Sequence, residues 1–408
     1  MQIKRVHIKN FKSIVDLSLD LAPINVFIGE NGSGKSNILE ALAFAAAAAA
    51  NKLDNEFLVS RGIRVTDARL MRSAFLDAIK DTISLDVEDE RGIQVAFELT
   101  TSGNISYPRW ESRTLIGLPP HTKPARNPAF IWLKSKVVED FINEMSKYTT
   151  KDRSAINEKE ILAINEILEN RLRQWNLDLP AFHKAETIPL EDFIVYSPEA
   201  SALRTFEKEG QILPLGVRGE GLLKLLRVLA REDKNGWSTL QHNLGLLDWL
   251  QGVEIDHDTT LPEQSIQLRD RFVAETQPAF DQRSANEGFL YLLFFFALIL
   301  SKATPRFFAI ENVDTSLNPK ACSELMRRIT SLAVERQKQI LLTTHNPSLL
   351  DGLNLHDDNQ RLFVVYRNRD GHTTARRIKP PQPVGDEPPI KLSEAFVRGL
   401  LGGIPQNF

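Results

Sequence analysis

The sequence predicts an α/β protein organised around a phosphate-binding loop, and three features lead to this prediction. Residues 29–36 fit the pattern G-x-x-x-x-G-K-[ST]. The apolar run 24–28 reads as a strand in front of this segment, and the residues behind it read as a helix. Two further apolar runs, 306–310 and 340–344, end in polar residues and enclose the helical segment 320–336. This β-α-β order is typical of folds whose strands end at one ligand-binding edge.

The loop at 29–36 carries the chemistry of nucleotide binding. Glycine lets the backbone wrap tightly, so that successive N–H groups point inward at a polyphosphate, and the helix N-terminus adds partial positive charge. We expect Lys35 to reach the β- and γ-phosphates of ATP and Ser36 to provide one ligand of Mg²⁺. ATP and Mg²⁺ are therefore the predicted cofactors. The other residues expected to contact the nucleotide here are Asn31, Gly32, Ser33, Gly34 and Asn37.

Composition narrows the class of protein. The chain has 408 residues, of which 42% are hydrophobic, enough for a large core or two lobes. A net charge of −3 and a pI of 6.3 give no global basic field, so bulk charge does not favour DNA, although local DNA contacts stay possible. Cys322 is the single cysteine, which argues against disulfides and suits the cytoplasm. The apolar run 289–300 is too short to span a membrane, so we expect a buried helix and no membrane partner.

The N-terminal part is predicted to be an ATPase lobe with an antiparallel β subdomain. Alternating residues predict strands at 2–8 and 14–21 and a hairpin at 83–99. The helix behind the loop continues into an alanine run, which favours helix and offers no reactive side chains. Lys12 could approach the nucleotide from this edge, but a solvated surface lysine is the favoured interpretation.

The rest of the chain divides by composition and period. Residues 101–128 have no strong period and read as a loop or an insertion, whereas 137–175 have apolar positions spaced by three and four, as in amphipathic helices. A helix is also expected at 237–250, and a terminal helix at 392–401 follows a hairpin and a Pro-rich linker. The predicted domains are an N-terminal lobe at 1–100, a helical insertion at 101–190, a second ATPase lobe at 191–352 and a C-terminal hairpin, linker and helix at 353–408.

Acidic and amide residues follow the strand 306–310. An apolar strand ending in acids is typical of a Walker B site, in which the first acid orders the water shell of Mg²⁺ and the next polarises the attacking water. Glu311 keeps a carboxylate for the metal, whereas Asn312 can hold a water but cannot act as a general base. Asp314 is the candidate substitute for that base. The sequence thus favours nucleotide binding and leaves hydrolysis in question.

The ordered motifs resemble the ABC-type ATPase heads of the RecF, SMC and OLD-like superfamily. The resemblance implies a P-loop fold with a mixed sheet, an antiparallel β subdomain and a helical lobe, here a short stub in place of coiled-coil arms. It implies a signature-like turn that reaches across a dimer to the γ-phosphate held by the other subunit, and a switch histidine, His345, that faces the γ-phosphate. The candidate signature residues are Ser284, Asn286, Glu287 and Gly288, with either Ser284 or Asn286 in the serine position.

Within that superfamily, the chain is most similar to the ATPase subunits of Septu-type antiphage defence systems, with ATPases of retron-associated and PARIS systems as close alternatives. This similarity rests on the ending 392–408 and on the lack of an evident effector domain. It implies a head-to-tail homodimer, or a higher homo-oligomer, with ATP at the interface. It also implies a separate effector protein, an HNH nuclease.

Three functions follow from these observations. The first is a regulatory ATP clamp with weak or absent hydrolysis that controls the effector. The second is a RecF-like DNA repair or recombination ATPase that hydrolyses ATP and binds DNA. The third is a structural scaffold with a vestigial site, which the intact Lys35 and Ser36 argue against.

Overall fold

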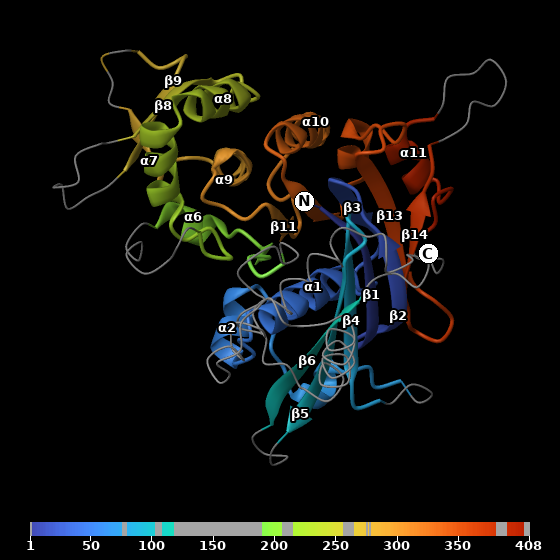
Figure 1. The fold of residues 1–408 in the computed structure, drawn as a ribbon. Coiled ribbons are helices and arrows are strands. Elements are labelled where there is room, and N and C mark those ends of the chain that lie inside the picture. Colours follow the sequence, from blue (N-terminus) through green and yellow to red (C-terminus); the bar gives the residue numbers. More distant parts are fainter. Residues whose placement is uncertain are drawn as a thin grey trace, which may run out of the picture.

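The computed structural model has two large sheets on opposite sides of one helix, and beside them a helical lobe with a small three-stranded sheet (Figure 1). The predicted helical block at 137–175 and most of the Pro-rich linker lie outside the described residues. The described residues are 2–75, 80–102, 108–117, 190–205, 215–255, 265–274, 276, 279–380 and 390–403.

A mixed six-stranded sheet forms the centre of the fold, and it confirms the predicted fold class. Its strands run parallel except for the antiparallel edge pair of β13 and β14. Three of the four inner strands, β3, β12 and β11, are buried at every residue, because helices cover both faces of the sheet. In spatial order the strands are β14 (Thr373–Ile378), β13 (Gln360–Arg367), β3 (Ile24–Ile28), β12 (Gln339–Thr344), β11 (Phe307–Ile310) and β7 (Val195–Tyr196).

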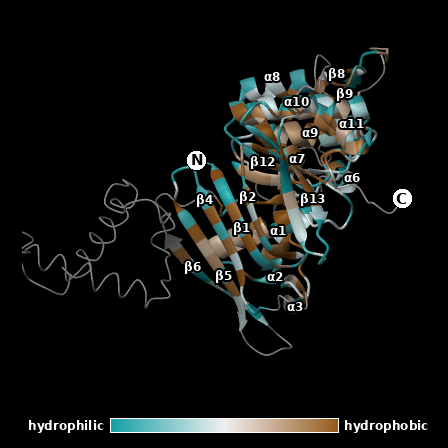
Figure 2. Cartoon of the chain, turned by 90° about the vertical axis from the view of Figure 1, so that its right-hand side faces the viewer, coloured by the Kyte–Doolittle hydropathy of each residue, from teal (hydrophilic) through white to brown (hydrophobic). Residues whose placement is uncertain are grey.

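The second sheet is a five-stranded antiparallel sheet in the N-terminal part. Its strands alternate between buried apolar and exposed polar residues, and Figure 2 shows this alternation as stripes along the strands. One strand, β6, lies in the segment 101–128, so the prediction of a loop was wrong for residues 109–117, and residues 118–128 lie outside the described residues. Strand β6 pairs with β5 along its whole length despite its weak sequence period. In spatial order the strands are β2 (Ile14–Asp20), β1 (Ile3–Phe11), β4 (Ile83–Asp89), β5 (Gln94–Ser102) and β6 (Arg109–Gly117).

Helix α1 (Lys35–Ala49) lies between the two sheets. Its alanine run, Ala45–Ala49, is buried, and it shares one core with both sheets, including Phe27 of β3 and Phe97 of β5. Small side chains let the two sheets approach the helix from opposite sides, which explains why the run is alanine throughout. Two short helices, α2 (Asn55–Ser60) and α3 (Ala68–Met71), follow α1.

The other face of the six-stranded sheet carries α9 (Glu287–Leu300) and α10 (Pro319–Glu335). Residues 289–300 are all buried, as predicted for a core helix. The predicted helix at 237–250 ends earlier, at Leu244, because Leu250 opens a three-stranded sheet that the sequence had not suggested. The remaining elements of this lobe are α6 (Ala200–Arg204), α7 (Leu222–Glu232), α8 (Lys234–Leu244), β8 (Leu250–Ile255), β9 (Ile266–Asp270) and β10 (Phe280–Asp281).

The C-terminal part packs beside the central sheet. After β12 the chain forms the 3-10 helix η5 (Pro347–Gly352), then the hairpin β13–β14, and finally α11 (Leu392–Val397). The terminal helix is thus shorter than the predicted 392–401 because a left-handed residue, Gly399, interrupts it. None of the helices in the described ranges is long and apolar enough to cross a membrane.

Candidate functional site

Three segments meet at the carboxyl edge of the central sheet. The loop 29–34 leaves β3 and enters α1, with Gly34 as the N-cap in the left-handed conformation, φ 106°. Ile28 of β3 pairs with Thr344 of β12, so His345 lies beside the start of this loop. Ile310 of β11 pairs with Leu342, so Glu311 and Asn312 follow at the same edge. Parallel strands thus bring together residues that are more than 300 positions apart in sequence.

Lys35 is buried at the first position of α1, with 6% of its surface exposed. Its Nζ donates hydrogen bonds to the carbonyls of Gly29 and Glu30, both at 2.9 Å. Burial lowers the pKa of Lys35 to about 8, although Glu30, Glu311 and Asp314 act in the opposite direction. The ammonium is therefore folded back onto its own loop, where a polyphosphate would provide better acceptors than the two neutral carbonyls.

Glu311 presents a carboxylate oxygen without a partner. Its backbone N–H donates to the Tyr196 carbonyl at 2.8 Å, whereas its buried Oε1 has no hydrogen-bond partner. A buried, unpaired carboxylate oxygen is costly unless a cation or donor joins it, so this atom fits a Mg²⁺ water shell. The half-buried Ser36, the second residue of α1, would provide the hydroxyl ligand. The described residues hold no group of three His, Cys, Asp or Glu able to bind a metal, but Mg²⁺ between phosphates needs none.

Asn312 and Asp314 lie in the turn after β11. Asn312 has a left-handed backbone, φ 51°, which asparagine tolerates better than most residues, and its side chain is exposed. Its N–H donates to Thr343 Oγ1 at 3.0 Å. Asp314 accepts a hydrogen bond from Thr344 Oγ1 at 2.6 Å, so its carboxylate already joins this turn to β12. Both residues thus lie at the edge of the site, where one oxygen of the Asp314 carboxylate already accepts a hydrogen bond.

His345 lies at the polar end of β12, as predicted. Partial burial and the charge of Lys35 lower its pKa, and Asp314 opposes this shift. A histidine with a lowered pKa is neutral at pH 7 and can donate or accept one hydrogen bond. His345, Lys35 and Asp314 therefore share one electrostatic environment.

The signature-like turn makes its contacts inside its own lobe. Asn286 caps α9 by accepting a hydrogen bond from the Phe289 N–H at 2.8 Å. Glu287 accepts one from Ser316 Oγ at 2.8 Å, and Ser284 Oγ donates to Asp281 at 3.2 Å. A Cβ at Gly288 would lie 3.1 Å from the Ser316 carbonyl, so glycine allows the turn after β11 to approach. Among the described residues, no hydrogen bond or ion pair joins these four residues to the loop 29–34 of the same chain.

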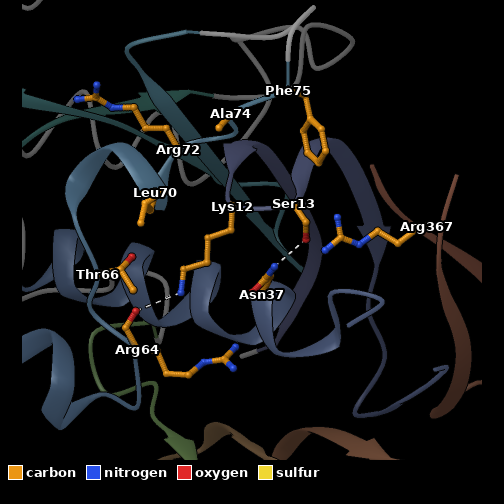
Figure 3. Close-up of a pocket in the computed structure, with 10 residues that line it drawn as sticks. All are labelled: Lys12, Ser13, Asn37, Arg64, Thr66, Leu70, Arg72, Ala74, Phe75 and Arg367. Carbon is orange, nitrogen blue, oxygen red and sulfur yellow. Dashed lines mark hydrogen bonds between the residues drawn. The ribbon is translucent and has the colours of Figure 1, made fainter. Parts of the chain in front are cut away.

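A basic pocket of about 510 Å³ opens beside the first turn of α1 (Figure 3). The sequence did not reveal it, because its walls come from the β1–β2 turn, the segment 64–75 and β13. Lys12 and Arg64 both contact Glu40, which is 1% exposed, so the interpretation of Lys12 as a solvated surface residue was wrong. The lining residues are Lys12, Ser13, Asn37, Arg64, Thr66, Leu70, Arg72, Ala74, Phe75 and Arg367.

Two family models match parts of the chain. Residues 1–188 match the model described as "AAA ATPase domain", and residues 250–351 match the one described as "AAA domain, putative AbiEii toxin, Type IV TA system". Both matched ranges include segments of the site: the first contains the loop 29–36, and the second contains Glu311 and His345.

Curated proteins match shorter segments of the chain. The chain is 33% identical over 89 residues to the DNA replication and repair protein RecF of Lactococcus lactis subsp. cremoris (strain MG1363), covering 22% of this chain and 24% of RecF. It is 37% identical over 57 residues to RecF of Clostridium botulinum (strain ATCC 19397 / Type A), covering 14% of this chain and 16% of that one. The match thus spans at most about a quarter of the length of these relatives.

The fold is similar to that of an SMC head crystallised with the C-winged helix domain of ScpA. This similarity covers 93% of the present chain and 98% of that structure, with a TM-score of 0.53 and 13% sequence identity. At this identity the match concerns the fold alone. The two family models, the RecF segments and this fold together support a RecF/SMC-like ATPase superfamily.

Proposed function

We propose that this chain, an ATPase of the RecF/SMC-like superfamily, is a regulatory subunit that dimerises head to tail around ATP and controls a separate effector. In this clamp, ATP joins two heads, weak or absent hydrolysis keeps them closed, and the effector stays inactive until ATP falls or a phage signal intervenes. The effector is an HNH nuclease of an antiphage defence complex. The sequence resemblance to Septu-type ATPases supports this role, as does a family description that names a toxin–antitoxin system.

The observation that carries the proposal is that a carboxylate residue, Glu311, is followed directly by an amide residue, Asn312. The unpartnered Glu311 Oε1 and the buried Lys35 favour a metal–nucleotide complex at this edge. Asn312 occupies the position of the base but has no carboxylate to accept a proton. Ser36 and Glu311 would hold Mg²⁺, which would neutralise phosphate charge. The site thus has residues that can bind ATP and Mg²⁺, but Asn312 cannot accept the proton that hydrolysis releases.

The basic pocket supports an assignment for the other end of the nucleotide. It adjoins the N-terminal turn of α1 through Asn37 and Ser13, which are joined by a 2.6 Å hydrogen bond. If the phosphates lie on the loop 29–34, the ribose and base extend into this pocket. Leu70 and Phe75 offer apolar surface to a base, while Lys12 adds positive charge near the phosphates.

The signature-like turn supports the dimer. Its four candidate residues contact α9, β10 and the turn after β11 of their own chain rather than the phosphate loop. A second copy, rotated so that its turn faces this loop, would complete the site. This symmetric exchange would bury two ATP molecules at one interface.

The first test is ATP binding and hydrolysis by the purified chain with Mg²⁺, with the mass in solution measured with and without ATP. We expect tight binding, an ATP-dependent doubling of the mass and phosphate release far below the order of 1 s⁻¹ that ordinary ATPases reach. Rapid phosphate release would contradict the clamp. Lys35→Ala is the matched control, since it removes the phosphate-binding cation.

A RecF-like repair ATPase is the second candidate, and the matches to RecF segments favour it. It would hydrolyse ATP faster with duplex DNA and would bind DNA with a steep dependence on salt. The same assay with added duplex DNA separates the two functions: stimulated turnover supports the repair ATPase, and unchanged turnover supports the clamp.

A further inference from the structure

The C-terminal hairpin β13–β14 holds two successive carbonyls of the phosphate loop. Arg367, at the end of β13, donates from Nε to the Gly32 carbonyl at 2.9 Å and from Nη1 to the Gly371 carbonyl at 2.7 Å. Thr373, the first residue of β14, donates from Oγ1 to the Ser33 carbonyl at 2.9 Å. The two bonds to the phosphate loop join residues 335 and 340 positions apart in sequence.

These two hydrogen bonds determine where the loop N–H groups point. A peptide unit is planar, and its C=O and the following N–H point in opposite directions. When the hairpin holds the carbonyls of Gly32 and Ser33 outward, the N–H groups of Ser33 and Gly34 point away from the hairpin, into the loop. Inward N–H groups are what an anion-binding loop requires.

Thr373 is the better anchored of the two residues. It is 1% exposed, its hydroxyl lies 2.7 Å from Ser13 Oγ, and its N–H donates to the Ser13 carbonyl at 2.8 Å. Ser13 Oγ in turn accepts a 2.6 Å hydrogen bond from Asn37 of α1. A buried chain of hydroxyl and amide groups therefore connects the hairpin, the β1–β2 turn, the phosphate loop and the helix behind it.

The close packing depends on Gly34. A Cβ on Gly34 would overlap the Thr373 side chain, and the φ of 106° independently favours glycine. The Thr373 side chain thus packs directly against the backbone of Gly34, and any larger residue at position 34 would prevent this packing.

We propose that Arg367 and Thr373 are positioning residues that hold the phosphate loop in its anion-binding conformation before the nucleotide arrives. The role in ATP affinity rests on the proposed nucleotide binding, whereas the hold on the loop does not. The hairpin β13–β14 is then part of the nucleotide site.

The test compares Thr373→Val with Thr374→Val. Valine has the shape of threonine without the hydroxyl, and Thr374 is the adjacent residue on the other face of β14. We expect Thr373→Val to weaken ATP binding about tenfold, because two hydrogen bonds of the hydroxyl are lost, and Thr374→Val to leave it unchanged. Thr373→Ser, which keeps the hydroxyl, should restore most of the affinity.

Arg367→Ala is paired with Arg369→Ala, an exposed arginine in the same hairpin turn. The Arg367 bond is exposed, so we expect a smaller loss of about fivefold in ATP affinity, with none for Arg369→Ala. Amide hydrogen exchange of residues 29–40, measured without nucleotide, should be faster in Thr373→Val and Arg367→Ala than in their controls. Thermal unfolding of each variant separates a local effect on the loop from general destabilisation.

The two proposals fail in different ways. If the wild-type chain binds no ATP, the proposed function is wrong, while the exchange experiment still tests the hold on the loop. If the wild type binds ATP and Thr373→Val and Arg367→Ala match their controls in both affinity and exchange, the positioning role is wrong.

Discussion

Thr344 donates a 2.6 Å hydrogen bond to Asp314, and this contact joins the end of β12 to the turn after β11. Thr344 is fully buried, and the next residue is His345. The contact thus fixes the spacing between the two strand ends that carry Glu311 and His345. It also gives Asp314 a structural task, which weakens its candidacy as a replacement base.

The first prediction concerns this contact. Thr344→Val keeps the shape of the side chain but leaves the Asp314 oxygen without its donor, so we expect a loss of about 1–3 kcal/mol in the free energy of unfolding. Urea unfolding measures it. In a cycle with Asp314→Ala, which removes the acceptor, the double variant should lose less than the sum of the single variants. Additive losses would show that the contact contributes nothing in solution.

The second prediction concerns Lys35. Lys35→Ala should abolish ATP binding, because no other cation occupies the first turn of α1 in the described structure. The melting temperature without ATP should not fall, because the pKa of Lys35 is lowered on balance: burial of the ammonium outweighs its two carbonyl hydrogen bonds and the nearby carboxylates. Lys320→Ala, an exposed lysine on α10, serves as the control for both measurements. Unchanged ATP affinity in Lys35→Ala would indicate a vestigial site.

The third prediction is a pH dependence of ATP affinity. The pKa of Lys35 in the free protein is about 8, below the ordinary 10.5, and bound phosphates would raise it. Between the free and the bound pKa, the complex holds more protons than the free protein, so affinity is highest below pH 8 and falls above it. The fall should approach tenfold per pH unit. Titrations from pH 7.5 to 9.5 check this, and Lys35→Arg should flatten the slope, because arginine stays charged.

The elements around the site could be predicted because their signals are local. The strand, loop and helix at 24–49 and the β-α-β unit around Glu311 and His345 follow from apolar runs and glycine spacing. The alanine run predicted a helix, but its position between two sheets depends on packing that composition does not encode.

The contacts that shape the site are long-range, and sequence patterns do not report them. Nothing in the sequence around Lys12 distinguishes it from a surface lysine. Only the fold brings it against Glu40, 28 residues away. Arg367 and Thr373 lie in a hairpin that was predicted correctly, yet their bonds to Gly32 and Ser33 span more than 330 residues. Strand β6 was missed because it is an edge strand, in which polar and apolar residues alternate only weakly.

The fourth prediction concerns the metal. Glu311→Gln keeps the size of the side chain but removes the charge that orders the Mg²⁺ water shell. We expect Mg²⁺ to tighten ATP binding in the wild type and to have at least about tenfold less effect in the variant, as for loss of a charged contact. Titrations with ATP in Mg²⁺ and in EDTA measure this difference, and affinity in EDTA should not fall. Equal Mg²⁺ effects in both proteins would remove Glu311 from the metal site.

The last prediction concerns Asn312. If hydrolysis is limited by the missing base, Asn312→Glu should raise phosphate release by about 10²-fold or more, the usual contribution of a general base. Asn312→Gln has the same length without the charge and should not raise it. Because the backbone at 312 is left-handed, φ 51°, both variants should lose about 1 kcal/mol of stability. If both variants lose stability but only Asn312→Glu gains turnover, the missing carboxylate is what limits hydrolysis in the wild type. Equal turnover in all three proteins would show that the missing base does not limit the rate.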